Sequence, residues 1–230
     1  MARRLWFPDT QPAPVTPPAP SGTDWEHVNS VQRALLLAPD GSALATTAYA
    51  PDAADDLTDK DSHHRQYVGP CLAAQTLSGN VTAQLQCQET FNNDNLFLAL
   101  KILVCNRAGS STAATLLAIT RATSAELSSS ADANRTFPST ALSSFACADG
   151  DRLVVEVGLG GSISSGVGGI IGHNGQIRWG CAATSGDLPV DESTTTATFR
   201  GWIEFSADFA WEATGEDTNL VIARTRFSEW

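Results

Sequence analysis

The chain has 230 residues, of which 42% are hydrophobic and 17% charged, which is the composition of a folded protein and not of a disordered one. Fourteen basic residues against twenty-five acidic ones give a formal net charge of −11. Such a surface repels a phosphate backbone, so we expect no nucleic-acid partner. The sequence has neither a run as long as a membrane span nor an apolar stretch typical of a secretory signal. We therefore expect no membrane partner, and synthesis in a cytoplasm.

Residues 1–20 are predicted to form a proline-rich arm outside the core. The arm begins with a basic and aromatic head, and six prolines follow between residues 8 and 20. Proline-rich segments favour extended polyproline II geometry and act as semi-rigid spacers. An exposed apolar head is costly unless it docks on another surface, so we expect it to make assembly contacts rather than to be a disordered tail. The predicted contact residues of the head are Arg3, Arg4, Leu5, Trp6 and Phe7.

Residues 21–206 are predicted to form an all-β domain, a jelly-roll-like β-sandwich of about ten short strands. Apolar residues alternate at period two in Leu96–Val104 and Leu153–Val157, and the segment Phe199–Phe205 follows the same pattern. In this pattern Lys101 and Glu156 face outward, away from the core. The polar segment 121–140 is predicted to be irregular, as a helical turn or a long crossover.

Residues 207–230 are predicted to form a C-terminal extension with one strand-like run, Leu220–Ala223. Its aromatic residues carry too much apolar surface to stay comfortably in water. We therefore expect the extension to pack on neighbouring subunits, with Trp211, Phe227 and Trp230 as contacts.

Three acidic or glycine-rich segments could carry chemistry, but a structural interpretation is favoured for each. Residues 51–64 are acidic and end in His63 and His64, but the spacing lacks the glycine and the bidentate glutamate of a calcium loop. Asp149–Asp151 is more typical of a tight turn than of a calcium site. The glycine-rich segment 158–172 contains no dinucleotide-binding spacing and is predicted to be a loop. We therefore expect no metal ligands and no cofactor.

The five cysteines are widely spaced, and none lies in a C-x-x-C pair. An odd, scattered set is typical of small buried hydrophobic residues in a reducing compartment rather than of a disulfide framework. The residues are Cys71, Cys87, Cys105, Cys147 and Cys181.

No set of catalytic residues can be recognised, so the sequence predicts a protein that is not an enzyme. Glu156 and Glu204 could be the two carboxylates of a glycosidase, but both are predicted to be outward-facing charges on strands. No Gly-x-Ser-x-Gly elbow is present. Tryptophans could instead form a sugar-stacking platform, although Trp25, Trp179 and Trp202 fall in strand-like runs and favour packing.

Several stretches together resemble a family of tailed-bacteriophage proteins found among virion structural genes. The resemblance covers the head and about residues 65–206, and departs from the family at Cys71, at residues 51–64 and at residues 207–230. The stretches that carry it are Arg4–Pro8, Trp25–Glu26, Arg65–Pro70, Leu72–Gly79, Leu142–Ser144, Asp149–Gly158 and Trp202–Ser206.

This resemblance implies a non-enzymatic virion protein, made in the cytoplasm of a bacterial host. Its expected role is capsid decoration, or a minor capsid or tail accessory protein, and the family supplies no catalytic residues. The expected partners are other virion proteins such as capsid, portal, tail or fibre, together with further copies of the same chain. The alternative is a carbohydrate-binding or receptor-binding sandwich module of a phage fibre.

Overall fold

The computed structural model describes residues 3–49, 60–90, 94–163, 175–180 and 186–212. The described part of the chain contains fourteen β-strands and no helix, so the prediction of an all-β fold is confirmed. In chain order the strands are β1 (Arg3–Trp6), β2 (His27–Val28), β3 (Gln32–Ala34), β4 (Ala45–Tyr49), β5 (Lys60–Cys71), β6 (Gln75–Leu77), β7 (Asn80–Glu89), β8 (Asp94–Cys105), β9 (Thr112–Arg121), β10 (Ala133–Ala141), β11 (Phe145–Cys147), β12 (Arg152–Ile163), β13 (Gly175–Trp179) and β14 (Trp202–Phe205).

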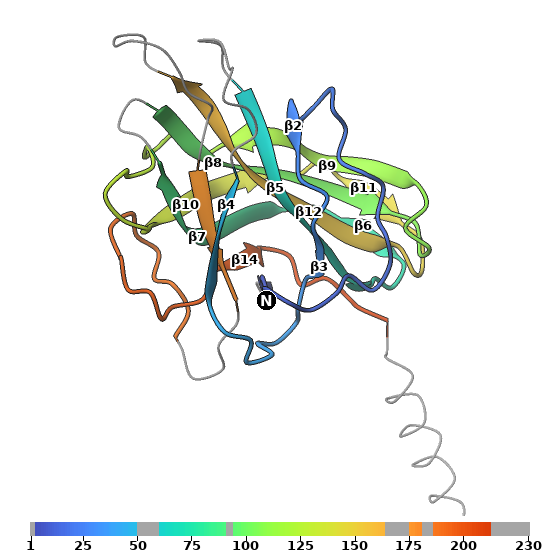
Figure 1. Cartoon of the computed structure of the whole chain (residues 1–230). Coiled ribbons are helices and arrows are strands. Elements are labelled where there is room, and N and C mark those ends of the chain that lie inside the picture. The colour runs from blue at the N-terminus through green and yellow to red at the C-terminus, as the bar shows by residue number, and fades with distance from the viewer. Residues whose placement is uncertain (1–2, 50–59, 91–93, 164–174, 181–185, 213–230) are drawn as a thin grey trace, which may run out of the picture.

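The strands form two six-stranded sheets that pack face to face as a jelly-roll-like sandwich (Figure 1). Sheet A has the order β1-β14-β7-β13-β4, and β10 pairs with the other edge of β7. Sheet B has the order β2-β5-β12-β8-β9, and β3 also pairs with β5. A separate pair, β6 and β11, completes the described strands.

The core lies between the sheets and follows the alternation predicted from the sequence. In β8 the five residues at period two from Leu96 to Val104 are fully buried against sheet A. The same holds for Leu153, Val155 and Val157 in the central strand β12. Neighbouring side chains on a strand point to opposite faces, so one apolar set per strand builds one continuous core.

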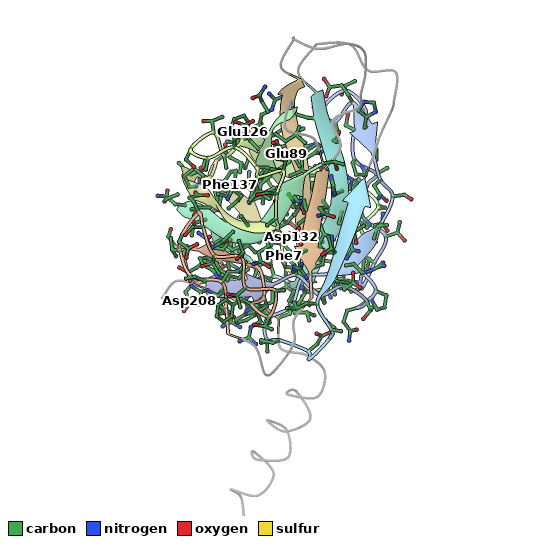
Figure 2. All side chains as sticks on the ribbon, turned by 60° about the vertical axis from the view of Figure 1, so that its left-hand side comes forward. Phe7, Glu89, Glu126, Asp132, Phe137 and Asp208 are labelled. Carbon is green, nitrogen blue, oxygen red and sulfur yellow. The ribbon has the colours of Figure 1, made fainter. Side chains whose placement is uncertain are left out.

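The first strand belongs to this core, so the prediction that the head stands outside it is wrong. β1 pairs antiparallel with β14, and Leu5 and Phe7 are 0% and 1% exposed. Phe7 makes edge-to-face contacts with Tyr67 and Trp179. Figure 2 shows Phe7 inside the molecule, whereas Asp208 lies at the surface. Burial between the sheets, rather than docking on a neighbour, removes this apolar surface from water.

Three segments differ from their predicted structure. Residues 60–64 of the expected acidic loop belong to β5, and residues 50–59 lie outside the described residues. Residues 133–141 of the expected irregular segment form β10, which pairs along β7. β12 continues through the first glycines of the expected loop to Ile163, while residues 164–172 lie outside the described part.

The turn predicted at Asp149–Asp151 is present. Gly150 has a φ of 89°, a left-handed conformation that a side chain disfavours. A Cβ atom there would also lie 2.2 Å from the guanidinium group of Arg107.

Within the described residues, no helix is long and apolar enough to cross a membrane.

Candidate functional site

Residues 8–26, here called the strap, cross the outer face of sheet B. The strap begins beside β3, where Pro12 forms an antiparallel bridge with Arg33. It then passes the β8–β9 turn, where only a glycine fits, because a Cβ atom at Gly109 would lie 2.4 Å from the carbonyl oxygen of Thr16. The proline-rich segment is therefore part of the domain and covers a face that would otherwise meet solvent.

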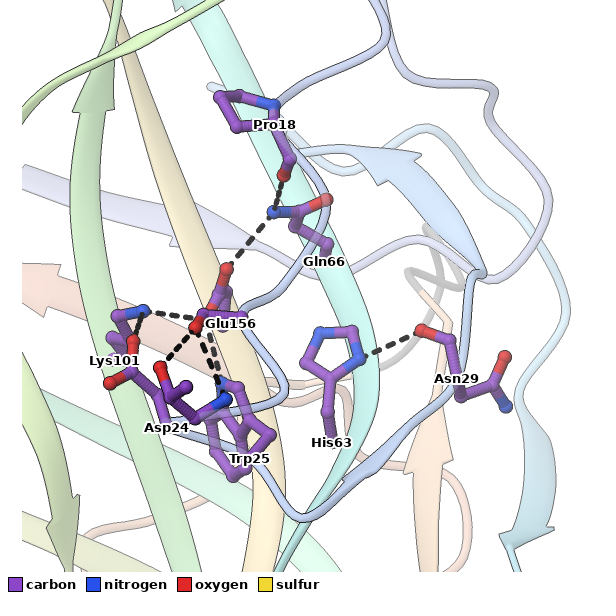
Figure 3. Close-up of polar contacts among 10 residues, drawn as sticks. Pro18, Asp24, Trp25, Asn29, His63, Gln66, Lys101 and Glu156 are labelled. Carbon is purple, nitrogen blue, oxygen red and sulfur yellow. Dashed lines mark hydrogen bonds and ion pairs between the residues drawn. The ribbon is translucent and has the colours of Figure 1, made fainter.

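Polar side chains of sheet B hold the strap in place (Figure 3). Glu156 accepts a hydrogen bond of 2.6 Å from Nε1 of Trp25 and one of 3.1 Å from Nε2 of Gln66. Lys101 lies 2.7 Å from Asp24 of the strap and 3.6 Å from Glu156. Gln66 also donates to the carbonyl oxygen of Pro18. Each of these sheet residues is buried under the strap.

The prediction that Lys101 and Glu156 face outward from the core is correct, but they are not exposed to solvent as outward-facing charges would be. Both point away from the core, yet the strap covers them and leaves them 6% and 0% exposed. Burial raises the pKa of Glu156, and the hydrogen bonds and the nearby Lys101 cation offset only part of that effect. Period-two alternation identifies the face of a side chain, but it does not reveal that a distant segment covers that face.

His63 and His64 are also buried, in β5, rather than part of a solvated loop. Burial lowers the pKa of His63 to about 4, and the Lys101 cation adds to this shift. Burial, with the neighbouring His63 and Arg65, lowers the pKa of His64 to about 3. The Nδ1 atom of His63 lies 2.8 Å from the carbonyl oxygen of Asn29 (Figure 3).

A partly open groove of about 590 Å³ lies between the strap and the segment that follows β3. Its size falls in the range of ligand sites in proteins, about 300–1,000 Å³. Its walls are mostly apolar, and its polar groups are two arginines, a glutamate and a thiol. The lining residues are Pro12, Pro14, Ala34, Leu35, Leu36, Leu37, Val68, Pro70, Cys71, Arg107, Arg152 and Glu212.

The two arginines of the groove have different partners. Arg107 pairs with Glu212 and lies 3.5 Å from Asp149. Arg152 donates to the backbone carbonyl oxygens of Gly69 at 3.1 Å and of Arg107 at 3.2 Å. No carboxylate of the described residues lies within ion-pair distance of Arg152. Within the described part of the chain, Arg107 thus has carboxylate partners and Arg152 has none.

Cys71 lies in the groove wall, with its sulfur 3.9 Å from Nη1 of Arg107. Of the four described cysteines, all with free thiols, Cys71 is half-buried and the other three are buried. Partial burial raises the pKa of the Cys71 thiol. Cys181 lies outside the described residues.

The predicted assembly contacts are not gathered in one place. Arg4 pairs with Asp187 and Glu204 and stacks on Trp202, while half-buried Trp6 donates to Asp187. Arg3 is half-buried in β1, beside the buried Leu5, and Phe7 follows that strand into the core.

The C-terminal contacts are described only in part. Trp211 forms a bridge with Leu72, near the groove, and is partly buried against the core. Phe227 and Trp230 lie outside the described residues. The groove itself was not predicted from the sequence, although Cys71 and the proline run both belong to it.

None of the five described tryptophans is exposed enough to form a sugar-stacking platform. Trp25, Trp179 and Trp202 are fully buried, and Trp6 and Trp211 are half-buried. Among the described residues, no group of three or more His, Cys, Asp or Glu side chains is arranged to hold a metal ion. The groove is thus a candidate binding site on the described surface.

No protein-family model matches the chain, and no curated protein matches it. Among solved structures, it is similar to a CocE/NonD family hydrolase from Staphylococcus aureus, with 12% identity, a TM-score of 0.45, and coverage of 89% of this chain and 36% of the hydrolase. It is also similar to an α-amino acid ester hydrolase, with 11% identity, a TM-score of 0.32, and coverage of 89% and 34%.

A virus structure is also among these solved structures. The chain is similar to the structure of the infectious bursal disease virus Gt strain, with 14% identity, a TM-score of 0.27, and coverage of 86% of this chain and 42% of that one. The chain thus spans less than half the length of each of these proteins.

The prediction that the chain is not an enzyme is contradicted by this comparison, because hydrolases come first among the similar structures. With TM-scores below 0.5, these likenesses assign neither an activity nor a role in a particle to the chain.

Proposed function

We propose that the chain is a structural protein of a tailed-bacteriophage particle and binds neighbouring subunits through the groove. The observation that carries this proposal is an apolar groove on the surface of a chain with a net charge of −11. Acidic surfaces of neighbouring copies repel one another, so a specific contact needs an apolar patch where charge is low.

The sequence resemblance supports the same role. The stretches that resemble phage virion proteins include Arg65–Pro70 and Asp149–Gly158. These stretches contribute Val68, Pro70 and Arg152 to the groove lining. The residues that carry the resemblance are therefore among those that build the proposed contact surface. Within a particle, a capsid decoration, minor capsid or tail accessory position is proposed.

The test is mass spectrometry of purified particles made with a groove variant and a matched control. Pro14→Glu places a carboxylate on an exposed wall of the groove, and Val190→Glu places one on a surface loop where the side chain is 70% exposed. We expect the wild-type chain and Val190→Glu in particles, and Pro14→Glu to be depleted. A chain that is abundant in infected cells but absent from particles would overturn the proposal.

A further inference from the structure

We infer that the groove receives an extended segment of a neighbouring subunit, whose apolar side chains fill the groove and whose single carboxylate binds Arg152. This inference rests on the proposed function and adds the chemistry of the partner. Two independent features of the groove lead to it: the small number of backbone N–H donors in its walls, and the guanidinium group of Arg152, to which the described residues supply no carboxylate.

The walls offer few backbone N–H groups to which a partner strand could bind. Pro12, Pro14 and Pro70 have no N–H group. The N–H and the carbonyl oxygen of Leu36 are both bonded to Trp6, and the N–H of Leu35 is bonded to Val68. We therefore expect recognition of a partner mainly through its side chains, and the leucine and proline surfaces favour apolar ones.

Arg152 determines where the carboxylate of the partner must lie. The guanidinium group of Arg152 has five N–H donors, and the described contacts use two of its nitrogen atoms. Arg107, by contrast, already holds the carboxylate of Glu212. A carboxylate that enters the groove therefore finds a free binding group at Arg152, where a charge-assisted hydrogen bond is about twice as strong as a neutral one.

Cys71 makes the occupancy of the groove measurable, because it lines the groove and is the least buried of the described cysteines. A maleimide reagent would be added to the free protein and to purified particles, with Cys71→Ser as the blank for any other thiol. We expect labelling of Cys71 in particles to be at least about tenfold slower than in the free protein, as for a site occupied at least nine-tenths of the time.

A photo-crosslinking residue in place of Pro14, on the exposed groove wall, would then identify the occupant. We expect the crosslinked peptide to come from a neighbouring subunit and to carry an aspartate or glutamate among apolar residues. Arg152→Met should restore Cys71 labelling in particles about tenfold or more, and Arg152→Lys should restore it less. Arg178→Met, in β13 and outside the groove lining, is the matched control. Urea unfolding of each variant separates loss of binding from loss of folding.

The outcomes separate this inference from the function on which it rests. If the chain is present in particles but its Cys71 reacts as fast as in the free protein, the inference fails and the proposed function stands. The inference also fails if Cys71 is protected but the crosslink captures no peptide, which is the result expected for a small amphipathic molecule in the groove. It fails too if the captured peptide has no carboxylate. Absence from particles overturns the proposed function first.

Discussion

Two carboxylates on opposite outer faces of the sandwich have similar partners and opposite pKa shifts. Glu156 of sheet B accepts an indole N–H from Trp25 at 2.6 Å, and Asp187 beside sheet A accepts one from Trp6 at 3.0 Å. Each also lies near a cation. Yet the pKa of Glu156 is raised and the pKa of Asp187 is lowered.

Burial and the number of cations explain the difference. Glu156 is fully buried, and the cation near it, Lys101, lies 3.6 Å away and is shared with Asp24. Asp187 is 20% exposed and pairs with two arginines, Arg4 at 2.8 Å and Arg200 at 2.5 Å. Partial burial raises the pKa of Asp187, but Arg4, Trp6 and Arg200 outweigh that effect. A carboxylate that accepts such a hydrogen bond can therefore have a raised or a lowered pKa. The extent of its desolvation decides the direction of the shift.

The largest expected effect is loss of stability in acid, caused by the two buried histidines of β5, His63 and His64. The pKa values of His63 and His64 are about 4 and about 3 in the folded state, against an ordinary 6.5. Below pH 6.5 the unfolded chain binds protons that the folded chain does not, so each histidine removes about 1.4 kcal/mol of unfolding free energy per pH unit. This loss continues down to each folded pKa and amounts to several kcal/mol in total by pH 4.

Urea unfolding between pH 7 and pH 4 measures this dependence. His63→Gln should make the slope shallower, since a glutamine does not titrate. His27→Gln, in the neighbouring strand β2, is the matched control. An unchanged slope in the His63 variant would show that other groups drive acid unfolding.

The second effect tests the buried carboxylate by removal. Glu156→Ala leaves Lys101 with Asp24, removes the acceptor of the Trp25 indole, and leaves Gln66 with the carbonyl oxygen of Pro18. Breaking a buried pair in this way costs about 3–5 kcal/mol of unfolding free energy. Asp187→Ala should cost only about 1 kcal/mol, because Arg4 keeps Glu204 and water reaches the site. Equal losses in urea unfolding would remove the distinction between the two sites.

The third effect compares the two indole donors. Trp25→Phe removes a buried hydrogen bond to a carboxylate and should cost about 1.5–3 kcal/mol. Trp6→Phe removes a similar bond at a half-exposed site and should cost less, about 0.5–1.5 kcal/mol. Thermal or urea unfolding of both variants at pH 7 gives the comparison, and a larger loss for Trp6 would contradict it.

The sequence predicted the sandwich because period-two alternation reports local geometry. The core faces of Leu96–Val104 and Leu153–Val157 follow from it directly. The place of residues 3–7 could not be predicted in this way, because β1 pairs with β14 about two hundred residues later. The groove depends on similar long-range contacts, since its walls come from the strap, residues 34–37, the ends of β5 and β12, Arg107 and Glu212. Such contacts leave no periodic signal in the chain.

The strap shows the same limit for charged residues. Lys101 and Glu156 lie on the face that alternation assigns to them, but only tertiary structure brings Asp24 and Trp25 over that face. A buried lysine and glutamate are rare unless paired, and the pairing is what the sequence could not supply.

The smallest expected effect tests the signs of the two pKa shifts with neutral variants of the same shape. Glu156 has a raised pKa in the folded state, so the folded chain binds more protons than the unfolded one above pH 4.5. The stability of the wild type relative to Glu156→Gln should therefore fall as the pH rises from 4.5 through the raised pKa. Asp187 has a lowered pKa, so the stability of the wild type relative to Asp187→Asn should be present above pH 3.8 and lost as the pH falls below that value. Urea unfolding across this range, with sodium sulfate added to keep the folded state populated in acid, gives both differences. If the stability of the wild type relative to both variants changed in the same direction with pH, burial would not distinguish the two carboxylates.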